Sequence, residues 1–133
     1  MTMKLKQYFE TASGTGVLST ADAGGRVDAA IYSTPHVMDD GTVAFVMLER
    51  LTHKNILSNP FAAYLFREEA PGYKGVRLFL KKIREDDDPE LIATMTKWLK
   101  PGLDAQKEPK HLVYFAVEKV LPLIGSGTAQ VTL

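Results

Sequence analysis

The sequence contains no cysteine among its 133 residues. A disulfide framework, a thiol nucleophile and a thiolate metal site are therefore excluded, and we expect a protein of the reducing cytoplasm. Net charge is also absent, because 16 Lys and Arg residues balance 16 Asp and Glu residues. Nucleic-acid phosphates attract a basic stripe, so we expect no nucleic-acid partner.

Long hydrophobic runs are missing as well. No stretch approaches the roughly 18 apolar residues that a membrane-spanning helix needs, and charges interrupt the first residues, MTMKLKQYFETASG, where a secretory signal would be apolar. We therefore expect neither a membrane partner nor a leader. The composition, 45% hydrophobic and 24% charged, is that of an ordinary globular protein. The length predicts a single domain over residues 1–133.

Short strands joined by turns dominate what is present. The patterns predict strands over residues 16–20, 27–34, 42–48, 61–66, 76–83 and 112–121, an added edge at 128–132, and helices over 4–11, 51–58 and from Asp88 to near Pro101. This order predicts a mainly β, antiparallel, Greek-key-like barrel of about six strands with appended short helices. The strand at 42–48 is apolar on both faces and is expected to be central. Such two-sided strands also predict a homodimer that covers one outer face.

The segment that starts the second helix carries the most chemical information. Thr52 is the predicted N-cap, so His53, Lys54 and Asn55 would occupy the first turn, where free backbone N–H groups favour an anion. First turns usually carry acids, whereas this one is basic, with Arg50 just before it. The pattern indicates a phosphate site; the alternative is a solvated helix start with exposed charges.

Other candidate residues have simpler interpretations. The acidic run Glu85–Asp88 precedes a helix and is interpreted as a solvated cap rather than a metal site, and no metal is predicted. His36, His53 and His111 are scattered, without ligand spacing for catalytic zinc. Trp98 could be core or could stack on a planar cofactor, and Tyr73, in a glycine-flanked loop, could contact a cofactor or a partner.

Three consecutive segments resemble a known family: Gly41–Met47, Arg50–Pro60 with its closing Asn-Pro pair, and Phe61–Phe66. This order of strand, basic turn, short helix and strand is similar to that of the pyridoxamine 5′-phosphate oxidase-like, FMN-binding split-barrel proteins. Together with the preceding helix and hairpin, the resemblance covers roughly residues 5–85. It implies a split barrel and a homodimer with FMN at the subunit interface.

The resemblance also implies roles for particular residues. The phosphate would lie against the basic turn, and the isoalloxazine ring would lie along the second and third strands. The implied phosphate ligands are Arg50, Thr52, His53, Lys54 and Asn55, and the residues lining the ring and ribityl chain are Ala29, Ala30, Ile31, Val46 and Met47. One departure is that Thr52 stands where the family usually has its phosphate lysine.

The leading hypothesis is therefore an FMN-dependent oxidoreductase with a small-molecule substrate or electron donor. Vitamin B6 oxidation is not assigned, because the arginine and lysine that such oxidases use for their substrate phosphate are not recognisable near the C-terminus. No side chain is identified as a catalytic acid, base or nucleophile. The alternatives are a non-enzymatic flavin electron carrier or sensor, a deazaflavin-binding protein, and a haem-binding member of the fold with His36, His53 or His111 as the axial ligand.

Overall fold

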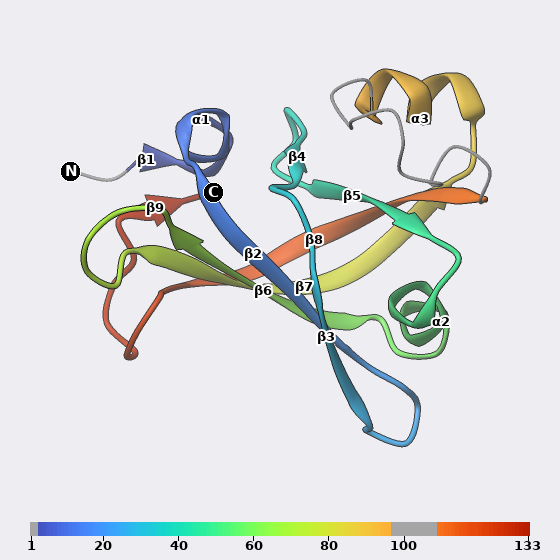
Figure 1. Cartoon of the computed structure of the whole chain (residues 1–133), viewed down its shortest axis with the longest axis horizontal. Helices are drawn as coiled ribbons and strands as arrows, with labels where there is room; N and C mark the ends of the chain where they lie inside the picture. Colours follow the sequence, from blue (N-terminus) through green and yellow to red (C-terminus); the bar gives the residue numbers. More distant parts are fainter. Residues whose placement is uncertain (1–2, 97–108) are drawn as a thin grey trace.

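The computed structural model describes residues 3–96 and 109–133, and strands dominate them. In chain order the elements are β1 (Met3–Lys4), α1 (Leu5–Thr11), β2 (Gly14–Ala21), β3 (Val27–Ile31), β4 (His36–Val37), β5 (Val43–Leu48), α2 (Leu51–Ser58), β6 (Phe61–Glu68), β7 (Gly75–Asp86), α3 (Pro89–Thr96), β8 (Lys110–Pro122) and β9 (Val131–Thr132). Figure 1 shows strongly curved strands crossing the molecule, with α1, α2 and α3 at their ends. None of the described helices has the length and apolar character that crossing a membrane requires.

The main sheet has seven strands in the order β3-β2-β6-β7-β8-β5-β4, all paired antiparallel. β5 leads through α2 to β6, yet it pairs with β8 on the far side of β6 and β7, which gives a Greek-key-like arrangement. The predicted mainly β, antiparallel fold is confirmed. β1 and β9 form a separate parallel pair that brings the two ends of the chain together (Figure 1). The sequence predicted that the segment at 128–132 adds an edge to the main sheet. In the structure, β9 pairs only with β1 and is not part of that sheet.

The hydrophobic core lies inside the curve of the sheet, where every second residue of each strand points. Its largest fully buried side chains include Tyr64, Phe66 and Phe115. α1 closes one end by burying Leu5, Tyr8 and Phe9. Phe9 meets Phe66 edge to face, with ring centroids 5.4 Å apart, a favourable aromatic geometry.

β5 is buried on both faces, but it is not central. It is next to last in the sheet order, between β8 and the short β4. Its inward face joins the main core, whereas Ala44 on the opposite face packs in a second apolar cluster with Ile92 of α3 and with Leu112 and Tyr114 of β8. A helix therefore covers the second face of β5, and the apolar sequence of this strand has that cause rather than a central position.

The helix starts differ in how far the sequence predicted them. At α3, Asp88 accepts a hydrogen bond from the backbone N–H of Glu90 at 3.0 Å, which confirms the predicted cap. At α2, the N-cap is Arg50 instead of Thr52, and no side chain caps the helix. Thr52 thus lies inside the first turn. Trp98, for which the sequence left open a core role or stacking on a cofactor, lies outside the described residues.

Candidate functional site

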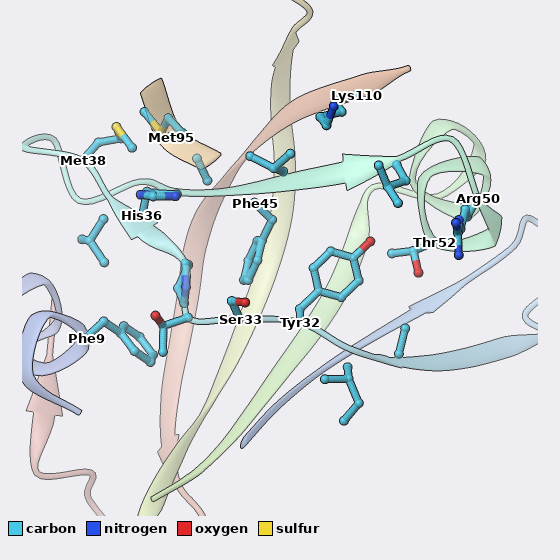
Figure 2. Close-up of a pocket in the computed structure, with 18 of the residues that line it drawn as sticks. Phe9, Tyr32, Ser33, His36, Met38, Phe45, Arg50, Thr52, Met95 and Lys110 are labelled. Carbon is cyan, nitrogen blue, oxygen red and sulfur yellow. The ribbon is translucent and has the colours of Figure 1, made fainter. Parts of the chain in front are cut away.

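A pocket of about 1050 Å³ opens between β3, the segment that follows it, β5 and the start of α2. This is the volume range of small-molecule and cofactor sites. Figure 2 shows Arg50 and Thr52 at one end of the pocket, His36, Met38 and Met95 at the other, and Tyr32 and Phe45 between them. The pocket therefore joins a polar, basic end to an apolar end.

The basic end is built by the first turn of α2. The amide of Lys54 donates to the carbonyl of Arg50 and begins the helical ladder, so the amides before it have no partner within the helix. The first turn carries no acid. Amide donors, the positive end of the helix dipole and the Arg50 guanidinium therefore meet where the pocket ends, an arrangement suited to a phosphate or another anion.

Tyr32 extends from the end of β3 toward this anion-binding turn (Figure 2). Burial raises the pKa of its phenol, and a hydrogen bond with Thr52 and the nearby Arg50 charge partly offset that increase. The phenol therefore stays protonated at neutral pH and can donate a hydrogen bond. Its ring meets Phe45 edge to face at 5.9 Å, which fixes the side chain against the pocket wall.

Tyr64 of β6 holds the part of the pocket wall that follows β3. Its hydroxyl lies 3.2 Å from the Tyr32 carbonyl and 3.1 Å from the Ser33 carbonyl, to which it donates. Gly16 of β2 makes room for this contact, because a Cβ at that position would overlap the Tyr64 hydroxyl. One buried hydroxyl group therefore holds the chain just after β3, and one glycine makes room for it.

His36 lies at the apolar end of the pocket, near Met38 and Met95 (Figure 2). Burial lowers the pKa of its imidazole below the usual 6.5, and a hydrogen bond with the Met95 backbone acts more weakly in the opposite direction. The side chain is therefore neutral at physiological pH. The sequence identified His36 only as one of three candidate haem ligands and did not predict its place in this pocket.

The structure brings half of the predicted site residues together. The pocket is lined by Ala30, Ile31, Val46, Arg50 and Thr52. The other five do not line it: Ala29, Met47, His53, Lys54 and Asn55. Ala29 points to the face opposite Ala30, and Met47 is fully buried in the core. Ile31 shares the Ala29 face but lies at the end of β3, where it borders the pocket. The alternation that places Ala30 in the pocket also places Tyr32 there, and this signal was available in the sequence.

The three α2 residues outside the pocket have different surroundings. Asn55 is buried and donates to the Thr20 hydroxyl at 3.1 Å, which joins α2 to β2. Lys54 is exposed. His53 is buried and its Nε2 lies 2.7 Å from Glu85 Oε1, so its ring faces the sheet.

Tyr73 lies in the loop between β6 and β7. The side chain is 73% exposed, and the Arg67 guanidinium lies 5.9 Å from the ring centroid. It does not line the pocket of this chain. Contact with a cofactor or partner therefore stays a prediction.

Comparison with known proteins identifies the fold. No protein-family model matches the sequence, and no curated protein matches it. An FMN-binding protein of Syntrophomonas wolfei is 18% identical over 92% of this chain and 85% of its own, with a TM-score of 0.74. HutZ, a haem storage protein of Vibrio cholerae, is 18% identical over 92% of this chain and 95% of its own, with a TM-score of 0.67. A candidate pyridoxamine 5′-phosphate oxidase of Lactobacillus delbrueckii is 16% identical over 86% and 88%, with a TM-score of 0.62.

At these identities the similarity identifies the fold alone. The chain has the split-barrel fold of the pyridoxamine 5′-phosphate oxidase-like proteins, as its sequence pattern predicted. Proteins of this fold carry different ligands and activities, so a function for this chain has to be argued from its own pocket.

Proposed function

We propose that the chain is a flavoprotein that binds FMN in this pocket and acts as an oxidoreductase. The observation that carries the proposal is the position of the α2 start, an anion-binding turn that forms one end of a large pocket. Arg50, Thr52 and the free amides would hold the phosphate. Ala30, Ile31 and Val46 would lie along the ribityl chain and ring, where small and apolar side chains allow a flat group to approach.

The flavin would supply the redox chemistry, and the protein would bind and orient it. Tyr32 keeps its proton at neutral pH, so its hydroxyl is a hydrogen-bond donor beside the phosphate end. His36 is a neutral imidazole at the other end, where it can orient a small-molecule substrate or electron donor. Met38 and Met95 make this end of the pocket apolar.

A homodimer is part of the proposal. The outward face of β3, β2, β6 and β7 is apolar and exposed: Ile31 is 72%, Phe61 54%, Leu65 39% and Phe79 37% exposed. Ile31 and Leu65 both lie opposite Val17 in the strand register, so these three residues form an apolar row across β3, β2 and β6. Lys81 and Arg77 lie opposite Phe61 and Leu65 at its β7 side. Large contiguous patches of this kind mark protein interfaces, and Ile31 borders the pocket, which would place each cofactor beside the interface.

The first experiment is the visible spectrum of the purified protein, followed by titration with FMN. We expect oxidised-flavin bands and, for Arg50→Ala, affinity lower by about 10- to 100-fold, because a charged hydrogen bond contributes roughly 1.5–3 kcal/mol. Arg26→Ala is the matched control, since this exposed arginine lies in the β2–β3 hairpin away from the pocket. Lys54→Ala tests whether the exposed lysine adds to the site. A colourless protein that does not bind FMN would refute the proposal.

Turnover separates an enzyme from a flavin carrier or sensor. An oxidoreductase should oxidise NAD(P)H or reduce an acceptor catalytically once FMN is bound. Reduction of the bound flavin without turnover would favour the non-enzymatic alternative. A deazaflavin, which shares the phosphate and the flat tricycle, is compared in the same binding titration.

Haem binding is a second candidate, because His36 is neutral and lies near Met38 and Met95 in the pocket. Histidine and methionine are both axial ligands of haem iron. A haemin titration that produces a Soret band in the native protein, and loses it in His36→Ala, would favour this function over FMN binding.

A further inference from the structure

We propose that His53, Glu85, Asp87 and His111 form a binding site for a divalent transition metal, with Zn²⁺ as the best match. This group, called the two-histidine cluster below, lies behind the wall of the pocket and takes no part in the proposed flavin site. Its members come from α2, the end of β7, the segment after β7 and the start of β8. The fold therefore gathers them from four separate places.

The donor atoms of the two-histidine cluster converge. Glu85 Oε1 lies 2.7 Å from His53 Nε2, and Glu85 Oε2 lies 3.8 Å from His111 Nδ1. Asp87 Oδ1 lies 2.8 Å from the same Nδ1. One nitrogen from each histidine and one Glu85 oxygen all lie within 4.8 Å of one another. Two imidazoles and a carboxylate are a ligand set that suits Zn²⁺ and its first-row neighbours.

The far side of His111 gives an independent observation. Its Nε2 is buried and forms no hydrogen bond within the described residues, although Glu49 Oε1 lies 3.5 Å away. A buried polar atom without a partner is costly. Metal-bound histidines characteristically donate their second N–H to a carboxylate. Binding through Nδ1 would place His111 in that arrangement, with Glu49 as the acceptor after a small movement.

The charges around the two-histidine cluster favour a cation. Glu85, Asp87 and Glu49 bring three carboxylates to the two rings, and the nearby ammonium group of Lys82, 3.6 Å from Glu85 Oε1, balances only one of them. Glu85 and Lys82 are about four-fifths buried, which limits compensation by water. A divalent ion would neutralise the remaining negative charge.

The rings of His53 and His111 are stacked, 3.9 Å apart and 3° from parallel. Parallel rings direct their in-plane lone pairs side by side, so both nitrogens reach one ion only after one ring turns. His111 is the ring that would turn, because His53 is fixed on a helix and its side chain is 6% exposed, against 12% for His111. The bound ion would join α2 to β7 and β8 and hold the turn that carries Thr52.

Zinc binding to the whole protein, purified without a histidine tag and treated with a chelator, tests the proposal. We expect calorimetry to give about one Zn²⁺ per chain, as for a single structural or catalytic site. His111→Ala and Glu85→Gln should each weaken binding by more than about 100-fold, because losing even an outer partner costs 10- to 100-fold. Glu49→Gln changes only that outer partner, so it should weaken zinc binding by about 10- to 100-fold.

His36→Ala is the matched control, since it removes the chain's one histidine outside the two-histidine cluster, and zinc affinity should not change. If Glu85→Gln fails to fold, the exposed Glu49 still provides a test, and zinc-dependent thermal stabilisation provides a second measurement. A wild-type protein that binds no zinc would overturn the proposal. Stoichiometric binding that survives both His111→Ala and Glu85→Gln would overturn it as well. Neither result depends on FMN binding.

Discussion

At the scale of single residues, Tyr64 holds the pocket wall with one hydroxyl group. Tyr64→Phe keeps the buried ring but leaves the Tyr32 and Ser33 carbonyls without this donor. We expect a loss of about 0.5–1.5 kcal/mol in the free energy of unfolding, the usual net contribution of one hydrogen bond, measured by urea denaturation. Tyr73→Phe, at an exposed position, should change it by less than about 0.5 kcal/mol. Equal effects of the two substitutions would contradict this role for Tyr64.

His36 gives a prediction about pH. Its pKa is lower in the folded protein than the usual 6.5, so the unfolded chain binds the proton first as the pH falls. Stability linked to His36 is therefore complete above about pH 6.5 and decreases as the pH falls through the folded-state pKa. We expect His36→Gln to flatten the dependence of the melting temperature on pH between about pH 5 and pH 8. Parallel curves for the two proteins would exclude this contribution.

At the scale of elements, the first turn of α2 lacks the acidic residues that would stabilise the helix through its dipole, and this leaves the turn suited to an anion. Leu51 is 54% exposed in the first turn and borders the pocket. Leu51→Glu should stabilise the helix by about 0.3–1 kcal/mol through the helix dipole, yet weaken FMN binding by repelling the phosphate. Denaturation and FMN titration measure the two effects separately.

Leu57→Glu is the matched control for that substitution, because Leu57 is 61% exposed in the last turn of the same helix. Here the acid meets the negative end of the dipole, so it should destabilise the helix slightly and leave FMN affinity unchanged. If both variants weaken FMN binding equally, the phosphate does not lie at the α2 start.

Local signals in the sequence predicted the individual helices and strands well. They did not predict which distant elements pair or pack together. The bounds of α2 match the predicted 51–58, because Asn59 and Pro60 end the helix whatever surrounds it. The apolar sequence of β5 correctly indicated burial on two faces, but not whether a helix or a strand covers the second face. The stacking of His53 on His111 depends on how β7 and β8 are aligned behind α2. No spacing rule within one segment contains that information.

The site residues follow the same division. Arg50 and Thr52 were found because helix starts have a local signature. His36 was predicted only as a possible haem ligand and the Tyr32–Thr52 contact was not predicted, because the chain just after β3 is held by Tyr64 of a different strand. Ala29 and Ala30 were both predicted, although neighbouring strand residues point to opposite faces. Which of the two faces carries the pocket became clear only from the sheet order.

At the scale of the whole molecule, the curved sheet seen in Figure 1 carries a pocket beside β3 and β5 and exposed apolar side chains on the outward face of β3, β2, β6 and β7. If the outward face of β3, β2, β6 and β7 pairs with a second copy, Leu65→Lys should disrupt the dimer, because it puts an unpaired charge on a surface that the dimer would bury. A two-fold interface carries each substitution twice. We therefore expect the dimer dissociation constant to rise at least about 100-fold, equivalent to roughly 1.4 kcal/mol per copy.

Sedimentation equilibrium measures this change, and Leu57→Lys is the matched control. Leu57 is 61% exposed but lies in the last turn of α2 and not on that face of the sheet, so its substitution should leave the dimer intact. FMN affinity is measured on both variants at the same protein concentration. Because Ile31 belongs to both the apolar face and the pocket, loss of the dimer should also weaken FMN binding. A monomeric Leu65→Lys protein with undiminished FMN affinity would show that one chain forms the whole site.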